Sequence, residues 1–146
     1  MRYVIIGNST AAVGAVEGIR KNDLEGEIII SKEPYHVYSR PLISYLLYGK
    51  TDEERMKYRS KDFYDTMNRK AILGREAVKI DDAKKEVHLD DGEVLNYDKL
   101  LVATGSLPFV PPMEGLDGVH KRFSFMSLDD AKKVESAISS NSKVLI

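Results

Sequence analysis

The chain has 146 residues, and its 22 Lys and Arg nearly balance 23 Asp and Glu, for a formal net charge of −1. This length suffices for one domain with a hydrophobic core, and the near-neutral charge argues against electrostatic binding of nucleic acid. The absence of cysteine excludes disulfides, thiol catalysis, iron–sulfur ligation and cysteine-based zinc sites. The sequence begins directly with a strand and has no apolar stretch that could cross a bilayer, so we expect a cytoplasmic protein without membrane contact.

The N-terminal segment is typical of a strand, a tight turn, a helix and a second strand. The apolar run Tyr3–Ile6 predicts the first strand, after which Gly7 can take a turn that a side chain would obstruct. The next helix would point its free N–H groups and positive dipole end at this turn, which suits a pyrophosphate. A second strand over Glu27–Ile30 would leave Lys32 and Glu33 at its carboxyl end. A carboxylate about 20 residues beyond a glycine turn is placed for ribose hydroxyls.

The glycine pattern departs from the full Gly-x-Gly-x-x-Gly fingerprint, since Gly7, Ser9 and Ala12 occupy its three positions. Ala12 is a mild change, because the third position needs only a small residue where the helix packs on the strand. Ser9 places a side chain where backbone and phosphate should approach, although its hydroxyl can donate to a phosphate oxygen. An ordinary turn between strand and helix stays open as the alternative, and the position of Glu33 favours nucleotide binding.

An extended aromatic segment follows, because Pro34 and Pro41 each disfavour helical geometry in the residue before them. Pro41 also suits the first turn of a helix, where its missing N–H costs nothing. Three short helices are expected from there on: Leu42–Tyr48, one at the capping-box sequence Thr51–Glu54, and Ser60–Arg69. Tyrosines are frequent in this region, and their packing against the sheet is favoured over contact with a ligand or partner.

The apolar periodicity then changes to that of strands. Four strands are expected: Ala71–Leu73, Glu76–Ile80, Glu86–Leu89 and Val94–Tyr97. The turn Asp90–Glu93 contains Asp-Gly and predicts a hairpin, so these strands should include a small antiparallel meander. The continuous apolar run Leu100–Ala103 predicts a strand covered on both faces, ending at Thr104 and Gly105. Ser127–Asp130 should cap a last helix that runs to about Ile138.

Three segments in this order carry a resemblance to a known superfamily: Val4–Ala12, Tyr38–Leu42 and Tyr97–Pro108. The chain resembles the N-terminal FAD-binding segment of the pyridine nucleotide-disulfide oxidoreductase superfamily. It is most similar to the branch of NADH oxidases, rubredoxin or ferredoxin reductases and NAD(P)H nitrite reductases. The resemblance covers essentially the whole chain. It implies a truncated α/β, Rossmann-like FAD/NAD(P)-binding domain, with a central parallel sheet, helices and a small antiparallel meander.

The resemblance also implies how the chain is organised. Residues 1–140 would be the N-terminal portion of a FAD-binding domain, and residues 141–146 the start of a missing NAD(P)-binding domain. Ser142–Ile146 begins like a new apolar strand, so we expect a piece of a longer protein. The family's late strand, which completes the sheet, is absent as well. Leu100–Ala103 would then be an unprotected edge, and we expect homo-oligomers through exposed strand edges.

The cofactor-binding residues implied by the resemblance follow the dinucleotide from its adenine end to its flavin. They are Ala77 at the adenine through backbone groups, Lys32 and Glu33 at the ribose, Gly7, Ser9, Thr10, Ala11 and Ala12 at the pyrophosphate, and Arg40, Pro41, Ala103, Thr104 and Gly105 toward the flavin. Taken alone, Arg40 would be interpreted as a solvated arginine, and Ala103–Gly105 as an ordinary end of a strand. Met126 stands where many relatives have an arginine, so one cation would be missing.

The implied cofactor is FAD, with NAD(P)H as the reductant of the full-length parent. The parent would be a FAD-dependent oxidoreductase that passes electrons from nicotinamide through flavin to an external acceptor, such as a redox partner protein. Without cysteines, the disulfide chemistry of the superfamily does not carry over. The 146-residue chain itself is expected to show no turnover and to bind FAD weakly or not at all.

Two other readings compete with this one. The first is a non-catalytic adenine-nucleotide-binding or interaction domain, which Ser9 and Met126 support. The second, a lone NAD-binding dehydrogenase domain, is disfavoured by the meander and by Ala103–Gly105. No metal site is expected, because the three histidines are scattered and show no acidic companions: His36, His88 and His120.

Overall fold

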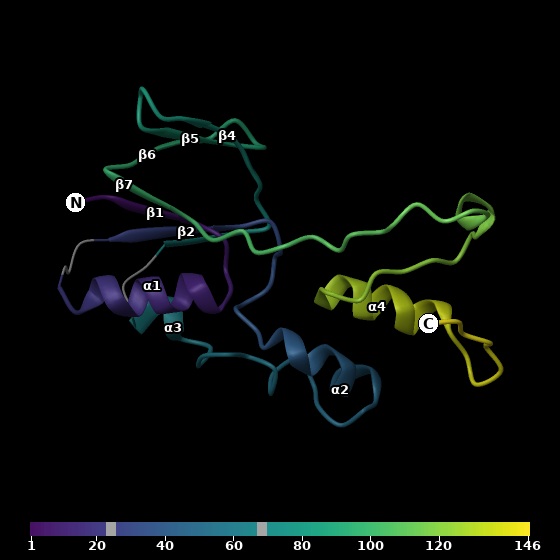
Figure 1. Ribbon diagram of the computed structural model, residues 1–146. Coiled ribbons are helices and arrows are strands. Elements are labelled where there is room, and N and C mark those ends of the chain that lie inside the picture. Colours follow the sequence, from purple (N-terminus) through teal and green to yellow (C-terminus); the bar gives the residue numbers. More distant parts are fainter. Residues whose placement is uncertain (23–25, 67–69) are drawn as a thin grey trace. The chain divides into compact units, whose positions relative to one another are not determined.

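The computed structural model describes residues 1–22, 26–66 and 70–146 (Figure 1). The chain forms two compact units. The sheet unit contains Met1–Tyr38 and Lys57–Gly105, and the helical unit contains Ser39–Met56 and Ser106–Ile146. Within the described ranges, no helix is both long enough and apolar enough to span a membrane.

The sheet unit is built on a four-stranded parallel sheet with the strand order β3-β2-β1-β7. Its strands are β1 (Tyr3–Ile6), β2 (Glu27–Ser31), β3 (Lys70–Leu73) and β7 (Lys99–Val102). The chain leaves β1 toward β2 and β3 on one side, and later returns to the other side of β1 as β7. This reversal creates a topological switch point at the carboxyl ends of β1 and β7, the place where open α/β sheets bind ligands.

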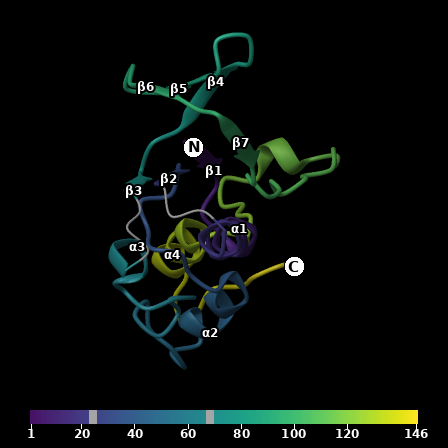
Figure 2. The same cartoon turned by 90° about the vertical axis from the view of Figure 1, so that its left-hand side faces the viewer.

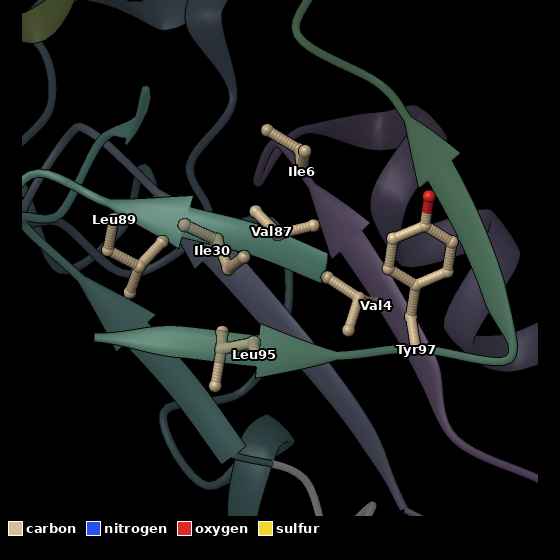
Figure 3. Packing of buried hydrophobic residues seen from close by; sticks show 7 residues of the cluster. All are labelled: Val4, Ile6, Ile30, Val87, Leu89, Leu95 and Tyr97. Atoms are coloured by element: carbon tan, nitrogen blue, oxygen red, sulfur yellow. The ribbon is translucent and has the colours of Figure 1, made fainter. Parts of the chain in front are cut away.

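One face of the parallel sheet is covered by a three-stranded antiparallel sheet with the order β4-β5-β6. Its strands are β4 (Ala77–Asp81), β5 (Glu86–Leu89) and β6 (Val94–Asn96). Val4 and Ile6 point to this side and pack with Val87, Leu89 and neighbouring apolar residues (Figure 3). The expected meander is therefore confirmed, and its inward residues form one half of the core.

The opposite face of the sheet is covered by α1 (Thr10–Arg20) and α3 (Phe63–Thr66) (Figures 1 and 2). Ile5, which alternates with its neighbours along β1, packs here against Val13 and Val16 of α1 and against Phe63. Both valines are buried, because their spacing places them on one stripe of the helix. The predicted βαβ unit and the Rossmann-like fold class are confirmed.

The helical unit contains η1 (Arg40–Leu42), α2 (Ile43–Leu47), η2 (Leu116–Gly118) and α4 (Leu128–Ala137). The predicted cap of α4 is present, since Ser127 Oγ accepts the Asp130 N–H and Asp130 Oδ2 accepts the Ser127 N–H, each at 3.1 Å. Burial alone would raise the pKa of Asp130, but hydrogen bonds from the Met126 and Ser127 N–H groups outweigh it and hold that pKa below its ordinary value. Lys132 Nζ lies 2.8 Å from Glu53 Oε1 and ties α4 to the segment after α2.

Three expectations about local structure are wrong. Residues 53–56 form a single turn instead of the helix expected at Thr51–Glu54: Asp52 Oδ1 caps the turn by accepting the Arg55 N–H at 2.8 Å, but the chain then extends at Lys57 to pair with Tyr38. The strand β7 is half exposed rather than covered, since it is the last strand on its side of the sheet, and Val102 is 56% exposed. Residues 142–146 form no strand, because they pair with no neighbouring strand. The helix expected over Ser60–Arg69 is confirmed only as α3, and residues 67–69 lie outside the described part.

Candidate functional site

The turn after β1 is closely enclosed by backbone from β2 and β7. Gly7 donates its N–H to the Ile30 carbonyl at 2.8 Å, and the Ala103 N–H donates to the Ile6 carbonyl at 2.7 Å. Gly7 has a φ of +122°, and a Cβ there would lie 2.1 Å from the Ala103 carbonyl oxygen. Glycine is therefore required twice over, by its conformation and by the approach of the chain leaving β7.

The helix α1 begins immediately beyond this turn, with Ser9 as its N-cap. The Ser9 hydroxyl makes no capping hydrogen bond, and the ladder of the helix starts with the Val13 N–H on the Ser9 carbonyl at 3.0 Å. The N–H groups of the first turn have no partner within the helix, and Thr10 and Ala11 are exposed. Ala12 is fully buried against the sheet, which explains a small residue at the third fingerprint position. This helix end can accept an anion.

Glu33 follows the carboxyl end of β2 and is half-buried. Its Oε1 accepts the Tyr38 hydroxyl at 2.8 Å, and its main-chain carbonyl accepts the Ser31 hydroxyl at 3.0 Å. These bonds fix both the backbone and the carboxylate of Glu33. Lys32 instead forms a surface ion pair with Glu76 at 2.9 Å, in which the lysine side chain is 74% exposed.

Two residues next to the turn after β1, Asn8 and Tyr64, were not predicted from the sequence as part of the site. Asn8 Oδ1 accepts the Tyr64 hydroxyl at 2.8 Å, and Asn8 Nδ2 donates to the Tyr35 carbonyl at 3.2 Å. Tyr64 comes from α3, and the tyrosine cluster was interpreted only as packing. No periodic signal could have found the pair, because 56 residues separate its members.

The expected adenine-side and flavin-side residues have different environments. Ala77 begins β4 opposite Leu89 and packs against the core cluster of the meander. Beyond β7, Ala103 lies against the Gly7 turn, while Thr104 and Gly105 are exposed. The sheet unit thus brings Gly7 and Ala103 together at the switch point, beside the start of α1.

Arg40 and Pro41 belong to the helical unit, where both lie in η1. Arg40 Nη1 donates to the main-chain carbonyl of Met126 at 3.2 Å. Met126, which stands where the resemblance implies an arginine, therefore accepts a hydrogen bond from Arg40, the other cation expected at the site.

The expectation that the histidines have no acidic companions is wrong for His88. Its Nε2 lies 3.3 Å from Glu86 Oε2, and one ligand atom each of Asp81, Glu86 and His88 lie within 4.8 Å of one another. Strand alternation puts Glu86 and His88 on the outer face of β5, and cross-strand pairing adds Asp81. Lys79 Nζ lies 4.0 Å from Asp81 and already supplies a cation to this group, so we interpret it as a surface ion-pair network.

Residues 1–146 match the family described as pyridine nucleotide-disulphide oxidoreductase. The chain belongs to this family. It is 35% identical over 147 residues to the NADH-dependent phenylglyoxylate dehydrogenase subunit epsilon of Aromatoleum evansii, covering 99% of this chain and 34% of that protein. It is 32% identical to the rubredoxin-NAD(+) reductase of Pseudomonas putida, covering 100% of this chain and 38% of the reductase.

Solved structures of this pyridine nucleotide-disulphide oxidoreductase fold agree with the sequence match. The crystal structure of NADH:rubredoxin oxidoreductase from Clostridium acetobutylicum superposes with a TM-score of 0.83 at 27% identity, covering 92% of this chain and 35% of that one. Putidaredoxin reductase, in its covalent complex with putidaredoxin, gives a TM-score of 0.81 at 26% identity, covering 93% and 34%. The chain therefore spans about a third of the length of these proteins.

Family membership supports FAD as the cofactor. The residues of the sheet unit fit the diphosphate of such a dinucleotide. Gly7 allows the chain that leaves β7 to approach the turn after β1, and the first turn of α1, which begins there, has N–H groups without a partner in the helix. The roles assigned to individual site residues stay predictions.

Proposed function

We propose that the chain is the FAD-binding portion of an NAD(P)H-dependent flavoprotein oxidoreductase. The observation that carries this proposal is the Gly7 turn, where the space of a side chain is taken by the Ala103 carbonyl and the start of α1 follows at once. Bound FAD would supply the hydride and electron transfer. The chain's own residues bind and orient the dinucleotide.

The proposed roles follow the arrangement of the sheet unit. The N–H groups of the first turn of α1, with Gly7 and Ser9, would bind the diphosphate. Glu33, held by Tyr38, would accept hydrogen bonds from the adenosine ribose. Ala77 would offer backbone groups to the adenine, and Lys32 would lie beside Glu33 at the ribose. Arg40, which belongs to the helical unit, is proposed from the family resemblance alone as a cation that offsets phosphate charge.

An external electron acceptor is part of the proposal. Relatives include proteins named rubredoxin-NAD(+) reductase and putidaredoxin reductase, so we propose that a small redox protein serves as acceptor for the full-length parent. Because the chain spans about a third of these proteins, residues 1–140 would form the first portion of the FAD-binding domain. Residues 141–146 would lead into the NAD(P)-binding domain.

Titration of FAD into the purified chain, combined with an assay of NADH oxidation, tests the proposal. We expect weak binding of FAD and no NADH oxidation by the 146-residue chain alone. Robust turnover would contradict the partial-domain proposal. A chain that binds neither FAD nor ADP-ribose at millimolar concentration would contradict the assignment of the dinucleotide site.

A non-catalytic adenine-nucleotide-binding domain is the second candidate. It is favoured by Met126, which supplies no cation where the resemblance implies a flavin-side arginine, and by Ser9 at the second fingerprint position. Parallel titrations with ADP-ribose and FAD separate the two functions. Binding of ADP-ribose with no binding of FAD supports this second candidate.

A further inference from the structure

The Tyr64 hydroxyl lies at the centre of a hydrogen-bond network with one consistent direction. The Val37 N–H can only donate, and it reaches the Tyr64 oxygen at 3.1 Å. The single proton of Tyr64 is then directed to Asn8 Oδ1 at 2.8 Å, which leaves Asn8 Nδ2 to donate to the Tyr35 carbonyl at 3.2 Å. Burial raises the pKa of Tyr64, so its hydroxyl keeps this proton at neutral pH.

This network joins the two segments that flank the dinucleotide site. Asn8 belongs to the turn between Gly7 and α1, whereas Tyr35 and Val37 belong to the segment that carries Glu33. The segment is anchored further by Val37, which is 1% exposed in the core beside α1, and by Tyr38, which holds the Glu33 carboxylate. The bridging hydroxyl thus fixes the distance between the helix end and Glu33.

We propose that Tyr64 is a positioning residue, which acts through Asn8 and Val37 to set the spacing between the diphosphate and ribose contacts. The inference rests on the proposed function, because it assigns a ligand to each side of this spacing. A ligand with both groups, such as ADP, depends on the spacing. Adenosine and inorganic pyrophosphate each use one side and do not depend on it. Tyr64 would thereby favour ligands that carry both adenosine and a diphosphate, although its own side chain contacts neither the ribose nor the diphosphate.

The test uses NMR-monitored titrations of the 146-residue chain with ADP, adenosine and inorganic pyrophosphate. Tyr64→Phe removes the bridging hydroxyl alone, and Asn8→Ala removes its acceptor together with the direct bond from Asn8 to the Tyr35 carbonyl. Tyr48→Phe is the matched control, because it makes the same change on a ring that is 76% exposed. Loss of one well-placed hydrogen bond predicts a loss of about five- to tenfold in ADP affinity for Tyr64→Phe. Affinity for adenosine and for pyrophosphate should change by less than about twofold.

The outcomes separate this inference from the proposed function. Equal ADP affinities of wild type and Tyr64→Phe overturn the positioning role alone, as does a parallel loss of affinity for all three ligands, which indicates general loosening. A wild-type chain that does not bind ADP overturns the proposed function and the inference with it. The double variant Asn8→Ala/Tyr64→Phe should lose no more ADP affinity than the weaker-binding single variant, because both changes cut one link. Additive losses contradict a shared network.

Discussion

Replacement of Gly7 by alanine should be among the most destabilising single-methyl changes in the sheet unit. The new Cβ would lie 2.1 Å from the carbonyl oxygen and 2.6 Å from the carbonyl carbon of Ala103, both of them backbone atoms. An alanine at a φ of +122° costs about 1–3 kcal/mol in backbone strain. Forcing a packed backbone apart adds about 1–3 kcal/mol. The sum, about 2–6 kcal/mol, is a large share of the 5–15 kcal/mol typical of a folded domain.

Urea unfolding followed by circular dichroism measures this loss, and two other glycines separate its causes. Gly92 has a φ of +89° with open space around a Cβ, so Gly92→Ala should show only the conformational cost, about 1–2 kcal/mol. Gly14 lies in α1 with open space, so Gly14→Ala should stabilise the chain by about 0.5–1 kcal/mol. If Gly7→Ala costs no more than Gly92→Ala, the backbone of β7 does not approach the turn as described.

Four further predictions concern other parts of the chain. Ser127→Ala should lower the free energy of unfolding by about 1 kcal/mol through loss of the α4 cap, measured in urea. The pKa of Asp130 is depressed in the folded chain, so its stabilisation is present above its unfolded pKa of about 3.9 and is lost as the pH falls through the folded value. Asp130→Asn should therefore flatten the acid dependence of the free energy of unfolding. An unchanged dependence would argue against the cap. Val102→Lys, on the exposed edge strand β7, should abolish self-association measured by light scattering, whereas the control Val119→Lys, which lies in no strand, should not. A wild-type chain that stays monomeric at high concentration would contradict self-association through this edge. The raised pKa of Tyr64 means that stability is full below about pH 10 and falls as the pH rises through the folded value, so Tyr64→Phe should show a smaller alkaline loss in urea titrations.

Local signals predicted the elements whose causes are local. The strand bounds Tyr3–Ile6 and Glu86–Leu89 are as expected, since apolar alternation and the Asp-Gly turn act within a few residues. The cap at Ser127 is likewise a local contact. A similar signal at Thr51 failed, because the chain extends at Lys57 to pair with Tyr38, a distant residue that the capping pattern does not encode.

Features that depend on distant residues were beyond the sequence. The need for glycine at position 7 was predicted from the turn, but the Ala103 carbonyl that enforces it comes from the other end of the sheet unit. The pair of Asn8 and Tyr64 is joined only by the fold, and nothing in either segment indicates the other. The exposure of Val102 follows from the position of β7 in the sheet, which the apolar run Leu100–Ala103 does not encode.

Mapping of amide chemical shifts during a FAD titration tests the central claim most directly. If the turn after β1 holds the diphosphate against the start of α1, the largest shifts should fall on the N–H groups of residues 7–12, with smaller shifts near Glu33. Shifts concentrated elsewhere would contradict the account. One such place is the shallow surface hollow at the opposite, amino-terminal edge of the sheet, lined by Arg2, Gly26 and Asp98.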